Sequence, residues 1–175
     1  RKNNISYIFT RGEHTSFPDN TFDLITVAQA IHWFDFNAFY KEVRRVAKSN
    51  ALLAVWGYGL TTVSPGIDAL VHDFYTNVIG KYWDVERKYI DEAYRTIQFP
   101  FRELQPPPFK IQERWSLDHF TGYLNSLSAV QNYVAANKRN PVDTLKKKIQ
   151  SLWYDKDVKE VRFPIFMRIG VMEKL

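Results

Sequence analysis

Residues 22–59, FDLITVAQAIHWFDFNAFYKEVRRVAKSNALLAVWGYG, decide the fold. Residues 22–29 are almost continuously apolar, which is typical of a strand that is buried on both faces of a parallel sheet. Residues 36–48 place apolar side chains at helical spacing, and residues 51–59 form a second apolar run that ends at glycines. The segment therefore predicts two parallel strands joined by a right-handed helical crossover.

Polar and aromatic side chains follow both predicted strands. The first strand ends in AQAIHW, residues 28–33, and the second ends in WGY, residues 56–58. Ligands of open parallel sheets bind outside the carboxyl ends of the strands. Because neighbouring parallel strands end at the same edge of the sheet, we expect these two groups to share one site.

The composition fits a globular domain with its own core, since 45% of the 175 residues are hydrophobic and 16% are aromatic. The chain has no cysteine, which excludes a disulfide framework, a thiolate zinc site and a cysteine nucleophile. Its histidines lack the spacing to acidic residues that metal ligands show, so we expect no metal. No apolar run is long enough for a membrane helix and none resembles a secretory signal, so we expect a cytoplasmic protein without a membrane partner.

The net charge is +5, and the basic residues are dispersed except at residues 138–139 and 146–148. The second cluster is either a solvated helix face or a nucleic-acid stripe, and the overall basic bias also fits an anionic small substrate. We expect no nucleic-acid partner, because the charge is dispersed and the base-flipping signature N/D-P-P-Y/F is absent. The unranked candidates for binding an anionic acceptor are Arg44, Arg45, Arg87, Arg95 and Arg102.

The middle of the chain differs from its start. Residues 64–83 and 85–97 have amphipathic helical patterns, and residues 98–109 are rich in proline. Residues 110–117 and 159–174 have strand patterns, with helical patterns between them. We expect three parts: a core segment over 1–60, a helical lid or insertion over 61–109, and the remainder of the core over 110–175.

The stretch SFPDNTFDLITVAQAIHWFD…EVRRVAKSNALLAVWGYG resembles class I S-adenosylmethionine-dependent methyltransferases, and most of all the small-molecule branch of the trans-aconitate methyltransferase type. Within it, PDNTFDLITVAQAIHWFDF is similar to the family's fourth-strand motif and RVAKSNALLAVWGYG to its fifth strand. RGEHTSFPDN is similar to the end of the third strand, where the family contacts adenine. The resemblance implies a Rossmann-like α/β sheet with the strand order 3-2-1-4-5-7-6.

The family's glycine-rich first loop and the acidic residue after its second strand have no counterpart in this sequence. With residues 5–10 as the third strand, the resemblance implies an incomplete sheet that lacks its first two strands. The third and fourth strands cannot pair without those two strands between them. We therefore expect an N-terminal segment of the same protein as a partner of this chain.

The resemblance implies a site for S-adenosylmethionine at the strand ends. The end of the third strand would contact the adenine, and small residues after the fourth strand would let the backbone pass close to the cofactor. Each position also has an ordinary structural explanation, such as a turn glycine, a surface histidine or strand-end packing. The expected cofactor-binding residues are Gly12, Glu13, His14, Ala28, Gln29, Ala30 and Trp33.

Methyl transfer from a sulfonium needs alignment and exclusion of water, and it needs a base only when the nucleophile is protonated. His32 is the candidate catalytic residue, either as a base or as a group that positions a carboxylate; it is equally a structural histidine that caps the loop. The expected substrate-binding residues are Trp56, Tyr58, Trp83, Trp115 and Tyr123.

These features predict a methyltransferase that acts on a small molecule, with a carboxylate as one candidate acceptor. The alternative is a non-catalytic remnant or binding module that keeps the fold without the methyl-donor site.

Overall fold

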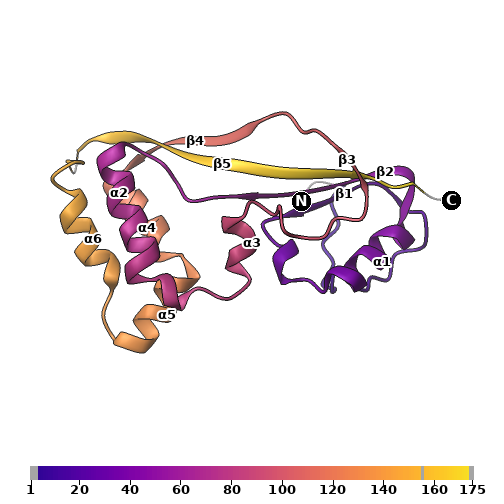
Figure 1. Ribbon diagram of the computed structural model, residues 1–175, viewed down its shortest axis with the longest axis horizontal. Coiled ribbons are helices and arrows are strands. Elements are labelled where there is room, and N and C mark those ends of the chain that lie inside the picture. Colours follow the sequence, from indigo (N-terminus) through magenta and orange to yellow (C-terminus); the bar gives the residue numbers. More distant parts are fainter. Residues whose placement is uncertain (1–3, 155, 174–175) are drawn as a thin grey trace. The chain divides into compact units, whose positions relative to one another are not determined.

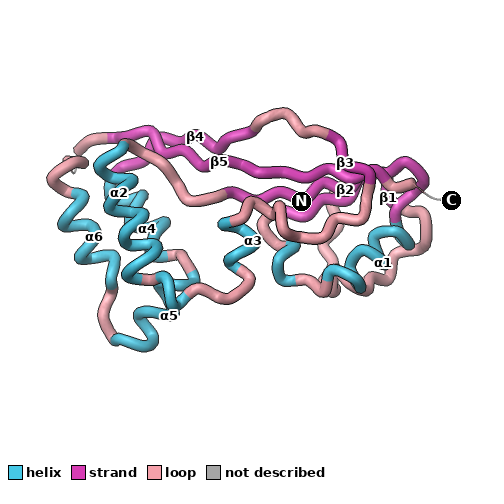
Figure 2. The backbone as a smooth tube through the Cα atoms, in the orientation of Figure 1, coloured by secondary structure: helices cyan, strands magenta, loops and turns pink. Residues whose placement is uncertain are grey.

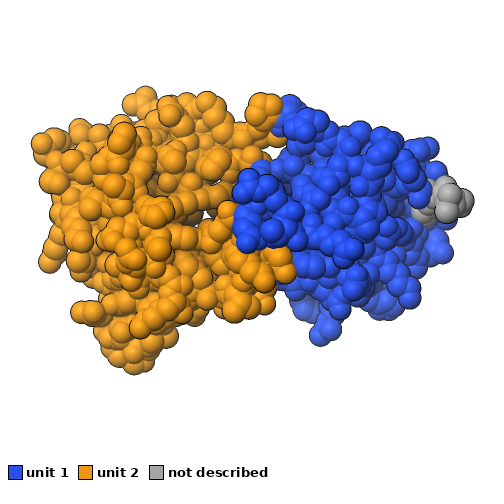
Figure 3. Space-filling model, viewed as in Figure 1, with its two compact units in different colours: residues 1–57, 92–107, 166–175 blue, residues 58–91, 108–165 orange. Residues whose placement is uncertain are grey.

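The computed structural model describes residues 4–154 and 156–173 and has an α/β fold with one five-stranded sheet (Figure 1). The chain divides into two compact units, and each is assembled from segments that are distant in the sequence (Figure 3). The three parts expected from the sequence, 1–60, 61–109 and 110–175, are instead continuous segments of the chain. Unit 1 consists of residues 1–57, 92–107 and 166–175, and unit 2 consists of residues 58–91 and 108–165.

The predicted strand–helix–strand unit is confirmed, but the burial expected on both faces of its first strand is not, since only Val27 of Phe22–Ala28 is buried. The strand–helix–strand unit consists of β1 (Phe22–Ala28), α1 (Phe36–Val46) and β2 (Ala47–Tyr58), and the two strands pair in parallel. The Asp35 carboxylate caps α1 by accepting a hydrogen bond from the Ala38 amide at 3.0 Å, which satisfies an amide at the helix start. The apolar face of α1 is buried in unit 1, so the crossover helix covers the sheet as its spacing predicts.

The other strands are β3 (Arg102–Leu104), β4 (Phe109–Ser116) and β5 (Val158–Val171). The sheet order is β1-β2-β5-β3, and β4 pairs with a different stretch of β5. Both β3 and β4 are antiparallel to β5. The order β1-β2-β5-β4 is the one that the resemblance implies for the fourth, fifth, seventh and sixth strands of the family.

The strand predicted over residues 5–10 is not formed. These residues have no strand assignment, and the side chains of Tyr7 and Phe9 are fully or almost fully exposed. A β-branched and aromatic run becomes a strand only when another strand supplies hydrogen-bond partners for its backbone. In the described part of the chain, no strand pairs with this segment.

Unit 2 contains most of the helices, and α6 contacts both α2 and α4 (Figure 2). The helical prediction over residues 85–97 is only partly confirmed, because α3 ends at Asp91. After it, Ala93 and Tyr94 have left-handed backbone angles. Among the described residues, none of the helices has both the length and the apolar character required to cross a bilayer. The helices are α2 (Pro65–Asp73), α3 (Arg87–Asp91), α4 (Leu117–Asn125), α5 (Ser128–Asn137) and α6 (Pro141–Ile149).

Candidate functional site

The carboxyl ends of β1 and β2 lie side by side in unit 1, as the sequence predicts. Ala28 is opposite Trp56 in the parallel register. The Gln29 amide donates a hydrogen bond to the Trp56 carbonyl at 2.8 Å and so extends the pairing by one residue. The residues that follow β1 therefore emerge beside Trp56 at one edge of the sheet.

Gln29 has a left-handed backbone at this edge, with φ of 52°. A non-glycine residue in this region is uncommon and is often found where function constrains the backbone. The Gln29 side chain lies over Gly57, where an added Cβ would be 2.7 Å from Gln29 Oε1 and 2.7 Å from the Phe166 ring. A residue with a Cβ at position 57 would therefore have to displace the side chains of Gln29 and Phe166.

An apolar hollow of about 320 Å³ follows β1 and α1 within unit 1. Three of the predicted cofactor-binding residues, Gly12, Ala28 and Ala30, contribute to its wall. A Cβ on Gly12 would lie 3.2 Å from the Phe34 ring, and the backbone of Gly12 is not left-handed. Gly12 lies in the turn between Arg11 and His14, but close approach to an aromatic ring, rather than a left-handed backbone, explains the glycine.

The neighbouring residues Glu13 and His14 have different positions. The Glu13 carboxylate accepts a hydrogen bond from the Asp35 amide at 3.2 Å, which ties this segment to the start of α1. His14 is exposed, and its amide donates to the Arg11 carbonyl in a turn. The structure therefore places Glu13 at the start of α1 and leaves His14 at the surface.

His32 is buried, with 7% of its surface exposed, and its Nδ1 lies 3.1 Å from the Tyr94 hydroxyl. Tyr94 is 1% exposed. The adjacent Trp33 is 57% exposed, with its ring 5.0 Å from the His32 ring. Sequence reasoning missed Tyr94, because it is 62 residues from His32 and lies in a segment with a helical pattern.

Arg168 of β5 holds the turn that carries Tyr94. Its Nη1 donates hydrogen bonds to the carbonyls of Tyr94 at 3.0 Å and Ile97 at 2.6 Å. Its Nε and Nη2 donate to the Glu103 carboxylate at 3.0 and 2.5 Å. These charge-assisted bonds from Arg168 hold the pKa of Glu103 below its usual value.

Three of the predicted substrate-binding residues come together within unit 2. The rings of Tyr58, Trp115 and Tyr123 surround Phe163 at centroid distances of 5.5, 5.5 and 5.2 Å. Burial, assisted by Tyr58, raises the pKa of Tyr123 to about 12, although the charge of Arg87 opposes this. The Tyr123 hydroxyl therefore stays protonated at neutral pH and is able to donate a hydrogen bond.

Trp83 lies in a second aromatic group of unit 2, and Trp56 belongs to unit 1. The Trp83 ring is 5.0 Å from the Tyr75 ring, and the Arg87 guanidinium lies 4.4 Å above it. Its Nε1 is buried and has no hydrogen-bond partner among the described residues. The predicted substrate-binding residues thus fall into one position on β2 and two groups in unit 2.

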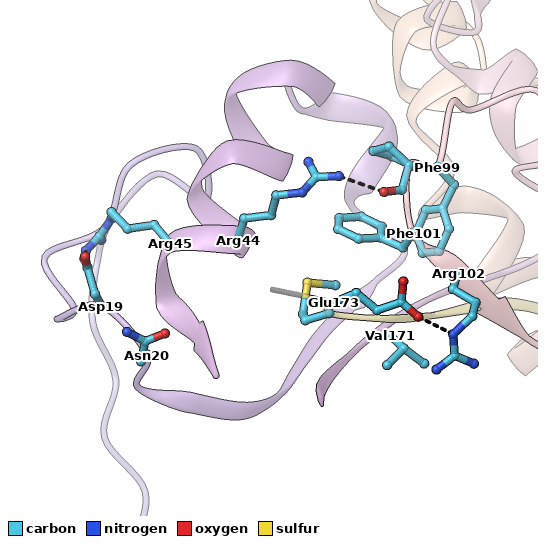
Figure 4. A pocket seen from close by; sticks show the side chains of 11 residues that line it. Asp19, Asn20, Arg44, Arg45, Phe99, Phe101, Arg102, Val171 and Glu173 are labelled. Atoms are coloured by element: carbon cyan, nitrogen blue, oxygen red, sulfur yellow. Dashed lines mark hydrogen bonds and ion pairs between the residues drawn. The ribbon is translucent and has the colours of Figure 1, made fainter. Parts of the chain in front are cut away.

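A larger hollow, of about 760 Å³, lies at the amino ends of β1 and β2 (Figure 4). Arg45 pairs there with Asp19 at 2.8 Å, and Arg102 pairs with Glu173 at 2.5 Å. Arg44 donates to the Pro100 carbonyl at 2.7 Å. Three of the arginines considered for an anionic acceptor are therefore at the end of the strands where parallel sheets do not bind ligands.

Among the described residues, no group of three or more histidine and acidic side chains is placed to hold a metal ion. At the carboxyl ends, the chain offers hydrogen bonding from Gln29 and the buried His32. These residues adjoin Ala28 and Ala30 in sequence, where an apolar hollow that runs along β1 from Phe22 reaches this edge.

Comparisons with known proteins point to one family. Residues 1–55 match a family described as a methyltransferase domain. A candidate methyltransferase of Dictyostelium discoideum is 31% identical over 180 residues, which cover 99% of this chain and 68% of that protein. The solved structure of a candidate type II methyltransferase from Anaeromyxobacter dehalogenans is 36% identical, with a TM-score of 0.91 over 100% of this chain and 75% of that one.

Neither match tests the trans-aconitate-like branch, which stays a prediction. The identity to the Dictyostelium protein extends over almost the whole chain, and the Anaeromyxobacter structure reproduces its Rossmann-like fold. The chain therefore belongs to the class I S-adenosylmethionine-dependent methyltransferase family.

Proposed function

We propose that this chain takes part in methyl transfer from S-adenosylmethionine to a small molecule, and that the acceptor group is a carboxylate. The observation that carries the proposal is the edge formed by the ends of β1 and β2. There, Ala28 and Ala30 face an apolar hollow, while Gln29 and the buried His32 supply polar groups. We further propose that the protein acts in the cytoplasm, within the trans-aconitate-like branch, and without a nucleic-acid partner.

The residues at this edge suit the cofactor. Gly12, Ala28 and Ala30 are small, so a flat adenine ring is able to approach the backbone, and the apolar lining suits its faces. Glu13 and Gln29 directly follow the lining residues Gly12 and Ala28 in the sequence. We propose that they offer polar atoms to the adenine and methionine parts of the cofactor. His14 and Trp33 would lie at the outer margin of the cofactor site. When bound, the cofactor supplies a methyl group that its sulfonium charge activates.

The acceptor chemistry follows from the groups available. A carboxylate nucleophile is already ionised, so it needs alignment and exclusion of water more than a base. We assign His32 the role of a hydrogen-bonding group for the acceptor. The proposed substrate-binding residues remain Trp56 in unit 1 and Tyr58, Trp83, Trp115 and Tyr123 in unit 2.

We also propose that a further segment of the same protein completes the sheet at β1. Among the described strands, β1 pairs only with β2, and its Leu24 is 54% exposed. An apolar edge strand is a site of aggregation unless another element covers it.

Titration calorimetry with S-adenosylhomocysteine tests the donor site. We expect binding in the micromolar range. In a Gly12→Val variant it should weaken about tenfold or more, because the valine would displace the Phe34 ring and fill part of the hollow. Gly122→Ala is the control, since an added Cβ there meets no atom within 4 Å. Absence of binding at millimolar ligand would contradict the proposal.

Mass spectrometry of reactions with a panel of small carboxylic acids tests the acceptor. We expect a methyl ester from at least one acid and no product from the matching amide. Binding of S-adenosylhomocysteine without any methyl transfer would support the non-catalytic alternative instead.

A further inference from the structure

The hydrogen bond between His32 and Tyr94 links the tautomer of the imidazole to the direction of the bond: Nδ1 either accepts from the hydroxyl or donates to it. Both residues are buried, and their polar atoms are 3.1 Å apart. Buried polar groups need hydrogen-bond partners, and a phenol hydroxyl is a strong donor toward a neutral imidazole nitrogen. A hydroxyl that donates to Nδ1 leaves the proton of the neutral ring on Nε2.

The backbone that delivers Tyr94 is strained. Ala93 and Tyr94 have consecutive left-handed φ values of 53° and 59°, and neither is glycine. For residues with a side chain, this conformation costs free energy, and such strain is concentrated at functional sites. The turn therefore persists only because the surrounding structure holds it.

Contacts of Arg168 and of the Tyr94 ring hold the turn in place. Arg168 donates to the carbonyls of Tyr94 and Ile97, and Glu103 fixes the other side of the guanidinium. The Arg168 guanidinium also lies 4.5 Å above the Phe99 ring. The Tyr94 ring packs edge-on against Phe166 at 4.9 Å, so its hydroxyl has a fixed position beside His32.

We propose that Tyr94 is a positioning residue for His32. Its hydroxyl donates to Nδ1, holds one orientation of the ring and keeps the proton on Nε2. His32 then acts toward the acceptor as a hydrogen-bond donor through Nε2–H, and a general-base role is excluded for this tautomer. The catalytic part of this inference rests on the proposed function, whereas the tautomer does not.

Nitrogen-15 NMR of the four histidines tests the tautomer without any methyl donor. A His32→Gln variant assigns the His32 signals. We expect Nε2 to carry the proton and Nδ1 to have the chemical shift of a hydrogen-bonded acceptor. In Tyr94→Phe, the chemical shift of Nδ1 should move toward that of an acceptor without this hydrogen bond. Tyr133→Phe is the control, because it removes a hydroxyl that is bonded to Arg139 in unit 2.

Two results would overturn the assignment: a proton on Nδ1 in the wild-type protein, or an unchanged Nδ1 shift in Tyr94→Phe. If Tyr94→Phe does not fold, Arg168→Lys replaces it. Lysine keeps the charge but lacks the planar guanidinium that bonds two carbonyls and Glu103 at once. The turn should therefore loosen, and the chemical shift of Nδ1 should change in the same direction as in Tyr94→Phe.

Kinetics separate positioning from structural support. Loss of one hydrogen bond predicts a fall in kcat of about 2- to 12-fold for Tyr94→Phe, with KM for the methyl donor unchanged. In a His32→Gln background, the same substitution should cause no further loss. Independent, additive losses would overturn the positioning role. If the wild-type protein transfers no methyl group, the proposed function has failed, and the NMR result alone decides the tautomer.

Discussion

The two ends of the β1–β2 pair have opposite chemistry. At the amino ends, arginines pair with exposed carboxylates, as in Arg45–Asp19 and Arg102–Glu173, and Arg45 also pairs with the buried Glu42. At the carboxyl ends, His32 is buried against a neutral hydroxyl and the Gln29 backbone is left-handed. Exposed ion pairs contribute little free energy, whereas buried polar groups and strained backbone are costly. The larger hollow is therefore not the better candidate site. Its arginines are already bound to carboxylates or carbonyls, and its left-handed residue, Asn20, is of a type that tolerates this backbone, unlike Gln29.

Gly170→Ala at the amino ends should have the largest effect on stability. An added Cβ would lie 2.6 Å from the Phe101 Cβ, an atom next to the backbone that has little freedom to move. We expect a loss of about 3 kcal/mol in the free energy of unfolding, measured by urea denaturation. Binding of S-adenosylhomocysteine should persist in the folded fraction.

Gly122→Ala in α4 is the matched control for this glycine. It adds the same methyl group where no atom lies within 4 Å, and alanine is the better helix former. It should raise stability by about 0.5–1 kcal/mol. Equal losses in the two variants would contradict the packing argument.

Glu42→Gln should have the next largest effect, because Glu42 is a buried carboxylate. It accepts hydrogen bonds from Thr15 and Arg45, and those with Arg45 contribute most to a pKa lowered from 4.5 to about 2. A depressed pKa stabilises the fold above pH 4.5, and this stabilisation is lost as the pH falls toward 2. We expect a loss of about 1.5–3 kcal/mol at pH 7.

The difference between wild-type protein and Glu42→Gln should therefore close between pH 4.5 and pH 2. Urea denaturation at several pH values measures it. A difference that stays constant across this window would show that the carboxylate charge is not responsible.

Gly57→Ala at the carboxyl ends should lower the free energy of unfolding less than Gly170→Ala does, but it should weaken ligand binding more. Its Cβ would meet Gln29 Oε1 and the edge of the Phe166 ring, and both are parts of side chains that are able to shift. We expect a loss of about 1–2 kcal/mol. Because Gln29 and Phe166 move, binding of S-adenosylhomocysteine should weaken, in contrast to Gly170→Ala. Unchanged binding in a destabilised Gly57→Ala protein would remove Gln29 from the proposed site.

Local patterns in the sequence were sufficient to predict β1, α1 and β2. Apolar runs and helical spacing act over a few residues, so they locate elements and the edge at which Gln29 and His32 emerge. They do not show which distant segments meet. The apolar run at residues 5–10 has a strand composition but forms no strand, because its state depends on a partner.

Tyr94 shows the same limit within the candidate site. Its contact with His32 spans 62 residues and depends on a turn without glycine, so neither spacing nor turn chemistry points to it. The arginines at the amino ends differ from Tyr94, because the sequence suggested a binding role for them that their positions in the fold do not favour. Their charge is conspicuous in the sequence, but the fold places them where local carboxylates and carbonyls bind them.

Arg44→Ala should have the smallest effect and therefore tests the comparison most directly. Arg44 is exposed, donates one hydrogen bond to the Pro100 carbonyl, and lies 4.8 Å above the Phe101 ring. Both contacts face water, so their loss should change the free energy of unfolding by less than about 0.5 kcal/mol. Methyl transfer should also be unchanged if the acceptor binds at the carboxyl ends. A fall in acceptor affinity without a change in stability would instead place anion recognition at the amino-end hollow and reverse the roles of the two ends.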